Sequence, residues 1–283
     1  MTTSRSKPAS SERPTPDDDV KKLDVRVLLL NCLALLAFAV AVAALFPTVG
    51  LADQAGLLDT ILLLTLTVTT LVATAQQLPW QNVLLAAAGI AVIGGGAHAA
   101  GVKTALPFGP FIFGENAGDK MFYTLPWMVP FLWIIIVLNA RGVARLILRP
   151  WRKAKTYGFR LLGATAVLTA LFDVAFDPFA THTKHFWIWT STKLPLTWLG
   201  APLVNFLAWG AVAALMLGFT TPALIRKQPG QKSGPDYHPL VVWLAAMLLF
   251  GTAAALNNLW PAVAVDAVIG IAVASFAISG ARW

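Results

Sequence analysis

Residues 157–176 read YGFRLLGATAVLTALFDVAF, and the chain continues directly through Asp177 and Pro178. The stretch is long enough for a membrane-spanning helix, which needs about 20 predominantly apolar residues. It nevertheless contains Asp173, and Asp177 follows one helical turn later. An Asp near the middle of a spanning helix disfavours insertion by roughly 2.5 to 3.5 kcal/mol. The stretch therefore predicts a membrane helix whose two carboxyl groups form a proton-handling or cation-stabilising site.

The composition of the whole chain indicates an integral membrane protein. Of its 283 residues 57% are hydrophobic and 12% are charged, and the mean hydropathy is +0.70. An average soluble domain has roughly 25% charged residues. We expect an all-α fold, a polytopic integral membrane helical bundle that forms a single transmembrane domain over residues 25–283. Besides residues 157–176, the apolar runs that predict its eight helices are 25–46, 56–75, 83–101, 122–139, 196–219, 239–256 and 261–279.

The distribution of basic residues predicts the orientation. Eight spans place both termini on one side, and 17 of the 21 Lys and Arg residues fall on that side. By the positive-inside rule both termini are cytoplasmic, which predicts a multi-pass protein of the cell membrane. Residues 1–24 lack an apolar face and are expected to form a disordered cytoplasmic tail. The net charge of +8 then reflects topology and anionic-lipid contacts, with no nucleic acid as a partner.

The motifs of soluble enzymes are missing. Cys32 is the only cysteine, which excludes an intramolecular disulfide and a thiolate metal cluster. The chain has no P-loop, no dinucleotide fingerprint, no HExxH and no nucleophile elbow. Residues 94–96 are three consecutive glycines inside a predicted span, where small residues typically permit close helix packing.

The carboxyl pair allows two interpretations. Asp173 and Asp177 share a helix face, and two carboxylates so close do not both ionise readily in a dry site, so one is expected to hold a proton. We expect Pro178 to end the helix, because the residue before a proline is biased away from helical geometry. In the alternative interpretation, Asp177 caps backbone amides in a turn and Asp173 pairs with a basic residue.

Other polar and aromatic residues gather at the same predicted membrane surface. His182 and His185 are three residues apart, so in a helix they could offer two ligands to a metal ion. A simpler interpretation is that both histidines lie at the membrane interface and contact headgroups and water. A lone Asn in an apolar run, such as Asn205, most often forms a hydrogen bond to a neighbouring helix, and it could also hold a water molecule. The predicted outer ends of the spans and the loops between them also hold the following residues: His98, Lys103, Glu115, Asn116, Asp119, Asp59, Asp266, Phe186, Trp187, Trp189 and Trp198.

Several ordered motifs resemble the membrane-embedded carotenoid hydratase family, whose members include γ-carotene and bisanhydrobacterioruberin hydratases. The similarity covers roughly residues 95–215. It rests on the sequences LPFG at 106–109, LPWMVPFLW at 125–133, DVAFDPF at 173–179 with WIW at 187–189, and GAPLVNFLAW at 200–209.

The resemblance implies a carotenoid biosynthesis enzyme, a carotenoid 1,2-hydratase that adds water to the terminal acyclic double bond and leaves a tertiary alcohol. A neutral carboxylic acid, Asp173 or Asp177, would protonate the less substituted carbon. Ring faces and the partner carboxylate would stabilise the cation, and Asn205 or a carboxylate would guide the water. No metal and no redox cofactor are required. The residues expected at the substrate are Trp187, Trp189, Phe186, Trp127, His98 and Glu115.

The partners implied are a carotenoid in the lipid phase, water and membrane lipids, with other enzymes of the carotenoid pathway as candidates. Three alternatives stay open. A carotenoid cyclase would use the same protonation but add no oxygen. A proton-coupled transporter would relay protons through the same acids, although we find no inverted repeat or matching broken helices. A non-catalytic pigment-binding protein would leave its carotenoid unchanged.

Overall fold

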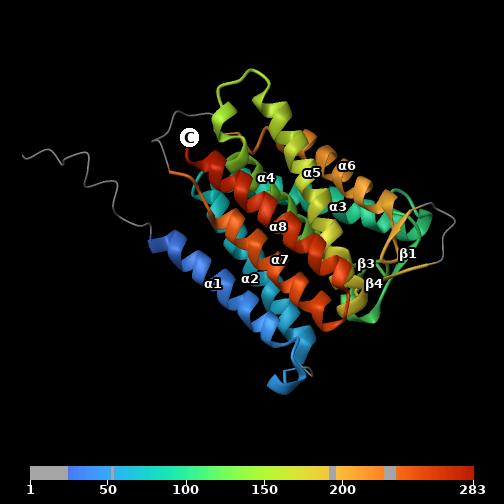
Figure 1. Cartoon of the computed structure of the whole chain (residues 1–283). Helices are drawn as coiled ribbons and strands as arrows, with labels where there is room; N and C mark the ends of the chain where they lie inside the picture. Colours follow the sequence, from blue (N-terminus) through green and yellow to red (C-terminus); the bar gives the residue numbers. More distant parts are fainter. Residues whose placement is uncertain (1–24, 52–53, 191–195, 226–233) are drawn as a thin grey trace, which may run out of the picture.

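A computed structural model of the chain describes residues 25–51, 54–190, 196–225 and 234–283. Within these ranges, eight helices are long and apolar enough to cross a membrane (Figure 1). The predicted tail, residues 1–24, lies outside the described residues. The helices are α1 Val25–Ala43, α2 Ala55–Ala75, α3 Trp80–Thr104, α4 Met128–Ile147, α5 Tyr157–Pro178, α6 Leu203–Thr220, α7 His238–Leu256 and α8 Trp260–Ala281.

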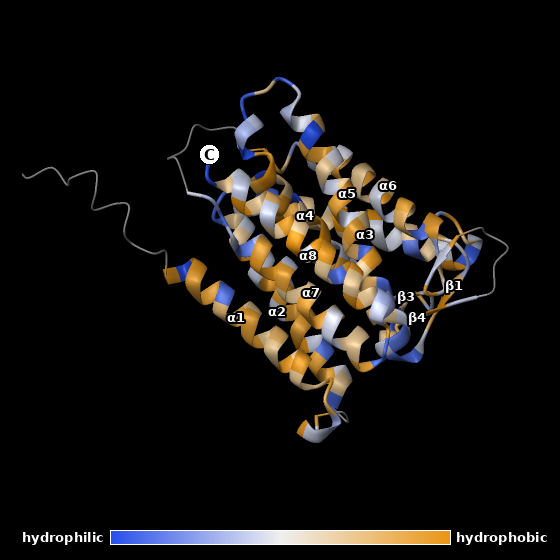
Figure 2. Ribbon diagram, viewed as in Figure 1, coloured by the Kyte–Doolittle hydropathy of each residue, from blue (hydrophilic) through white to orange (hydrophobic). Residues whose placement is uncertain are grey.

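The helices consist mostly of apolar residues along their lengths, and polar residues gather toward the two ends of the bundle (Figure 2). Large apolar side chains such as Leu85, Val92 and Ile271 are more than half exposed in the middle of their helices. A soluble protein would bury such surface, whereas lipid tails solvate it without cost. The prediction of a polytopic membrane helical bundle is confirmed.

Helix α4 occupies the centre of the bundle and contacts α2, α3, α5, α7 and α8. Small residues allow this close packing. A Cβ atom added to Gly94 of α3 would lie 2.5 Å from the Trp133 ring of α4. One added to Gly280 of α8 would run into the carbonyl oxygens of Leu146 and Ile147. Gly280 therefore lets two backbones come into contact, and Gly94 makes room for a large ring, where lipid offers no hydrophobic driving force.

Two predicted helix starts are wrong. The apolar run 122–139 begins six residues before α4, and the run 196–219 begins seven residues before α6. Both early segments form short antiparallel ribbons, in which β2 Lys120–Met121 pairs with β3 Leu125–Pro126 and β5 Thr197–Trp198 pairs with β6 Ala201–Pro202. Hydropathy alone does not distinguish an apolar strand from the first turn of a helix. Helix α4 also runs beyond Asn139, through the arginines that lower the local hydropathy.

A third ribbon carries aromatic residues to the end of the bundle opposite the C-terminus (Figure 1). Strand β1 Phe111–Phe113 pairs antiparallel with β4 Trp187–Trp189, so that Phe111 faces Trp189 and Phe113 faces Trp187. Side chains alternate between the two faces of a strand, so Trp187 and Trp189 project from the same face. The sequence-based interpretation of this region as a loop missed the pairing.

Candidate active site

Asp173 and Asp177 lie on one face of α5, and both side chains are fully buried. Asn205, in the first turn of α6, donates its side-chain amide to Asp173, with Nδ2 and Oδ2 2.6 Å apart. The other carboxyl oxygen of Asp173 is buried and has no hydrogen-bond partner in the described part of the chain. Asp173 therefore has one oxygen held in place and one that can carry a proton without giving up a hydrogen bond.

Asp177 receives its hydrogen bonds from the β1–β4 ribbon. The indole N–H of Trp187 donates to Oδ1 at 2.9 Å, and that of Trp189 lies 3.1 Å from Oδ1 and 3.3 Å from Oδ2. Within the described residues, neither Asp173 nor Asp177 forms an ion pair. The alternative interpretation, in which Asp177 caps backbone amides and Asp173 pairs with a basic residue, is wrong.

Pro178 does not end the helical path, contrary to our expectation. Asp177 is helical, and after Pro178 the chain continues as the π-helical turn η5, Phe179–Thr183. Pro178 lacks an N–H, which leaves the Val174 carbonyl oxygen without its usual helical partner. The indole N–H of Trp198 donates to that oxygen at 3.1 Å. A side chain distant in the sequence thus supplies the missing donor, which lets α5 stay intact beside its carboxyl groups.

An aromatic cluster packs against the same region, made of His98, Phe108, Phe111, Phe113, Trp133 and Trp209. Trp133 donates its indole N–H to Nδ1 of His98 at 3.1 Å and stacks on Trp209 with ring centroids 4.1 Å apart. Trp209 lies one helical turn after Asn205, and Phe111 contacts Trp189 with centroids 5.6 Å apart. The aromatic cluster therefore reaches the carboxyl pair from two sides, next to Asn205 through Trp209 and next to Asp177 through Trp189.

A cavity of about 310 Å³ lies along another face of α5, bounded also by α2, α4 and α7. Its walls are apolar in the bundle interior, and Phe172, Phe176 and Phe179 cover its α5 side. Phe176 also contacts Trp187, with centroids 5.4 Å apart, so these two rings connect the cavity wall to Asp177. The end of the cavity near the start of α2, which we call its outer end, is lined by polar or amphipathic residues. They are Asp59, Thr60, Glu115, Asn116 and Trp127.

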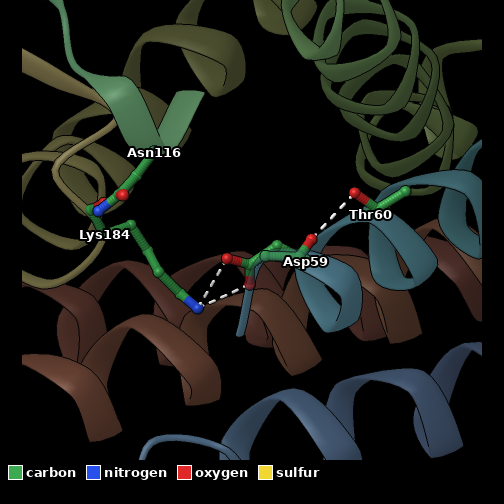
Figure 3. Close-up of polar contacts among 5 residues, drawn as sticks. Asp59, Thr60, Asn116 and Lys184 are labelled. Carbon is green, nitrogen blue, oxygen red and sulfur yellow. Dashed lines mark hydrogen bonds and ion pairs between the residues drawn. The ribbon is translucent and has the colours of Figure 1, made fainter. Parts of the chain in front are cut away.

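An ion pair joins two segments at that outer end (Figure 3). The Nζ atom of Lys184, which follows η5, lies 2.6 Å from Oδ1 and 2.9 Å from Oδ2 of Asp59 on α2. Asn116, in the turn η3 Glu115–Ala117, donates its side-chain amide to the carbonyl oxygen of Lys184 at 3.0 Å. Lys184 therefore connects α2, η3 and the end of α5 at the outer end of the cavity.

The nine residues nominated from the sequence fall into three groups. Asp173 with Asn205 and Asp177 with Trp187 and Trp189 form two hydrogen-bonded groups one turn apart on α5, which we together call the carboxyl cluster. Phe186, Trp127 and Glu115 line the cavity, and His98 belongs to the aromatic cluster.

Sequence reasoning missed the contact between Trp198 and Val174 and the ion pair of Asp59 with Lys184. In the sequence, the one signal for the contact between Trp198 and Val174 was Pro178, whose lack of an N–H leaves a helix carbonyl oxygen in need of another donor. His182 bonds the Leu199 carbonyl oxygen, and no group of three or more His, Cys, Asp or Glu in the described ranges is arranged to hold a metal ion.

Comparisons with known proteins agree with the resemblance seen in the motifs. A bisanhydrobacterioruberin hydratase from Haloarcula japonica is 31% identical over 127 residues, which are 44% of this chain and 41% of that protein. This match spans less than half the length of that relative. No solved structure matches the chain significantly. The model of the family described as "Carotenoid biosynthesis protein" matches residues 56–273, most of the chain, and the protein belongs to that family.

Proposed function

We propose that this protein hydrates the terminal acyclic double bond of a carotenoid. The observation that carries the proposal is the carboxyl cluster: two fully buried carboxyl groups, held by an amide and two indole N–H groups, with no cationic partner among the described residues. A buried carboxyl group without a counter-ion is suited to exchange a proton with a bound molecule. The family and the hydratase relative support the same substrate class.

The reaction proceeds in two steps. A neutral carboxyl group transfers its proton to the less substituted alkene carbon, which leaves a tertiary cation on the other carbon. A water molecule then forms the new C–O bond, and its surplus proton returns to a carboxylate. Alkene and water are thereby converted into a tertiary alcohol with the acid regenerated, and no electrons are exchanged with a cofactor.

The contacts support different roles for the two acids. Asp177 accepts from two indole N–H groups, which stabilise a negative charge, whereas one oxygen of Asp173 has no donor. We assign the transferred proton to Asp173 and the stabilisation of the cation to the Asp177 carboxylate. The rings of Trp187 and Trp189 add their electron-rich faces.

The apolar cavity is our candidate for holding part of the polyene chain, because Phe186, Trp127 and Glu115 line it. A volume of about 310 Å³ corresponds to roughly ten water-sized groups, enough for one end of a long chain. A substrate end that approaches Asp177 from this cavity must displace the Phe176 or the Trp187 ring.

The test is pigment analysis in a host that makes acyclic and monocyclic carotenoids. The wild-type protein should yield pigments heavier by one water. Asp173→Asn and Asp177→Asn should each reduce this product about 100-fold or more, the range expected for a lost general acid. Asp266→Asn is the matched control, because Asp266 is a buried acid of α8 outside the carboxyl cluster.

Three outcomes would count against the proposal. Pigments of unchanged mass but with a new ring would indicate a cyclase. Carotenoid that co-purifies unaltered would indicate a pigment-binding protein. Wild-type pigment profiles in both Asp variants, at wild-type protein levels, would remove the carboxyl cluster from the chemistry.

A further inference from the structure

A second cavity, of about 690 Å³, lies at the other end of the bundle from the carboxyl cluster. It is bounded by the end of α4, the start of α5, the end of α6 and the segment that leads into α7. Four arginines line it, spaced by three or four residues along α4 and the following turn η4, Arg149–Trp151. They are Arg141, Arg145, Arg149 and Arg152.

Asp236 is the one carboxylate among the described residues that line this arginine cavity, against four arginines, so most of the positive charge is not offset. Arg141 is only 9% exposed, and its guanidinium donates to the Leu224 carbonyl oxygen at 2.7 Å. The Nε atom of Arg149 is buried without an acceptor. None of the four arginines forms an ion pair within the described ranges.

The acid in the lining keeps its negative charge, but it bonds neutral groups and not an arginine. Asp236 accepts from the Gln77 side-chain amide at 2.7 Å and from the backbone N–H of His238 at 3.0 Å. Gln77 in turn accepts from Arg145 at 2.5 Å. Arg141 is the buried cation of the four, and a buried cation without a counter-ion is costly, so an anion from outside the described residues would complete this arrangement.

We propose that the arginine cavity binds the phosphate-bearing headgroup of a membrane amphiphile. Guanidinium groups match phosphate oxygens through paired charge-assisted hydrogen bonds. Part of the remaining wall is apolar and includes Leu146, Leu161, Leu162 and Leu217, which suits a tail attached to the phosphate. Basic pockets between membrane helices are known to recognise anionic headgroups. An anionic phospholipid and a prenyl diphosphate share this chemistry.

A built binding site can be distinguished from diffuse positive charge on the loop, because basic residues of the same loop that lie outside the cavity serve as a matched control. Lys153 and Lys155 follow directly in the same basic loop, are exposed, and do not line the cavity. The double variant Arg149→Gln/Arg152→Gln and the double variant Lys153→Gln/Lys155→Gln remove the same charge from the same loop. If the attraction to anionic lipid is diffuse, both double variants should bind the lipid equally weakly. If the cavity is a built site, only the arginine variant should bind more weakly.

The experiment is a lipid titration of the purified full chain in neutral detergent, followed by native mass spectrometry. The probes are dioleoylphosphatidylglycerol, geranylgeranyl diphosphate, inorganic diphosphate and zwitterionic dioleoylphosphatidylcholine. We expect at least one anionic lipid to bind more tightly than phosphatidylcholine and than inorganic diphosphate. The arginine variant should bind it about tenfold more weakly, the size expected for a lost charge-assisted hydrogen bond, and the lysine variant should stay within about twofold of wild type.

The relative affinities of the phospholipid and the prenyl diphosphate identify which amphiphile the cavity prefers. Equal weakening in both double variants, equal affinity for phosphatidylcholine, or binding of inorganic diphosphate with no gain from a tail would each overturn the proposal. Arg149→Lys, which keeps the charge but loses the paired geometry, provides a folded comparison. The test does not depend on hydratase activity.

Discussion

Asn205 donates its side-chain amide to Asp173 across the α5–α6 interface, with Nδ2 and Oδ2 2.6 Å apart. It is the one side chain of the described residues that bonds this carboxyl group, whose second oxygen has no partner. The orientation of the proposed proton donor therefore depends on a residue from a neighbouring helix. This relationship leads to the first prediction.

Asn205→Leu should leave the Asp173 carboxyl group buried without its donor and free to rotate. We expect the hydrated pigment to fall about tenfold to 100-fold, because loss of a hydrogen bond to a charged or reacting group costs roughly 1.5 to 3 kcal/mol. Quantified pigment per unit of protein is the measurement. The control is Asn139→Leu, which removes a buried amide bonded to Thr70 in the centre of the bundle. If Asn139→Leu lost as much hydrated pigment as Asn205→Leu, the loss would be due to impaired folding and not to Asp173.

Trp187→Phe and Trp189→Phe keep an aromatic ring and remove the indole N–H that bonds Asp177. Each variant should lower hydration about tenfold, and the double variant more, because the Asp177 carboxylate loses the donors that stabilise its charge. The same pigment assay applies. Trp260→Phe, at the exposed start of α8, should have no effect. Full activity of the double variant would show that the rings alone are sufficient.

Gly280→Ala should destabilise the bundle by about 1 to 3 kcal/mol, as expected for overpacking, because the added Cβ would run into the carbonyl oxygens of Leu146 and Ile147. Gly163→Ala is the matched control in α5, where a Cβ meets no atom within 4 Å. Thermal unfolding in one detergent compares the two. The control should be as stable as wild type or more stable, since Ala favours helix by up to about 1 kcal/mol over Gly. Similar midpoints for both variants would contradict the close α4–α8 contact.

Both termini should lie in the cytoplasm. Green fluorescent protein fused to either end should fluoresce, and alkaline phosphatase fused to either end should be inactive, because the former requires the cytoplasm and the latter the exterior. A phosphatase inserted after Asp119, in the loop between α3 and α4, should be active. The opposite pattern at all three sites would invert the orientation that the basic loops predict.

The sequence by itself determined the class of fold, the eight spans and the shared helix face of Asp173 and Asp177. These properties depend on local hydropathy and on the helical period, which a linear sequence records directly. The helix starts at Met128 and Leu203 were harder to predict, because an apolar strand and an apolar helical turn have the same hydropathy.

Only the tertiary structure decided which groups meet the carboxyl pair. The pairing of β1 with β4 turns two indoles toward Asp177, and the packing of α6 on α5 brings Asn205 to Asp173. Likewise, Trp198 replaces the amide that Pro178 lacks. The residues joined by these side-chain hydrogen bonds are up to 32 positions apart in the sequence. Whether they meet depends on how helices and strands pack, which no local sequence pattern encodes.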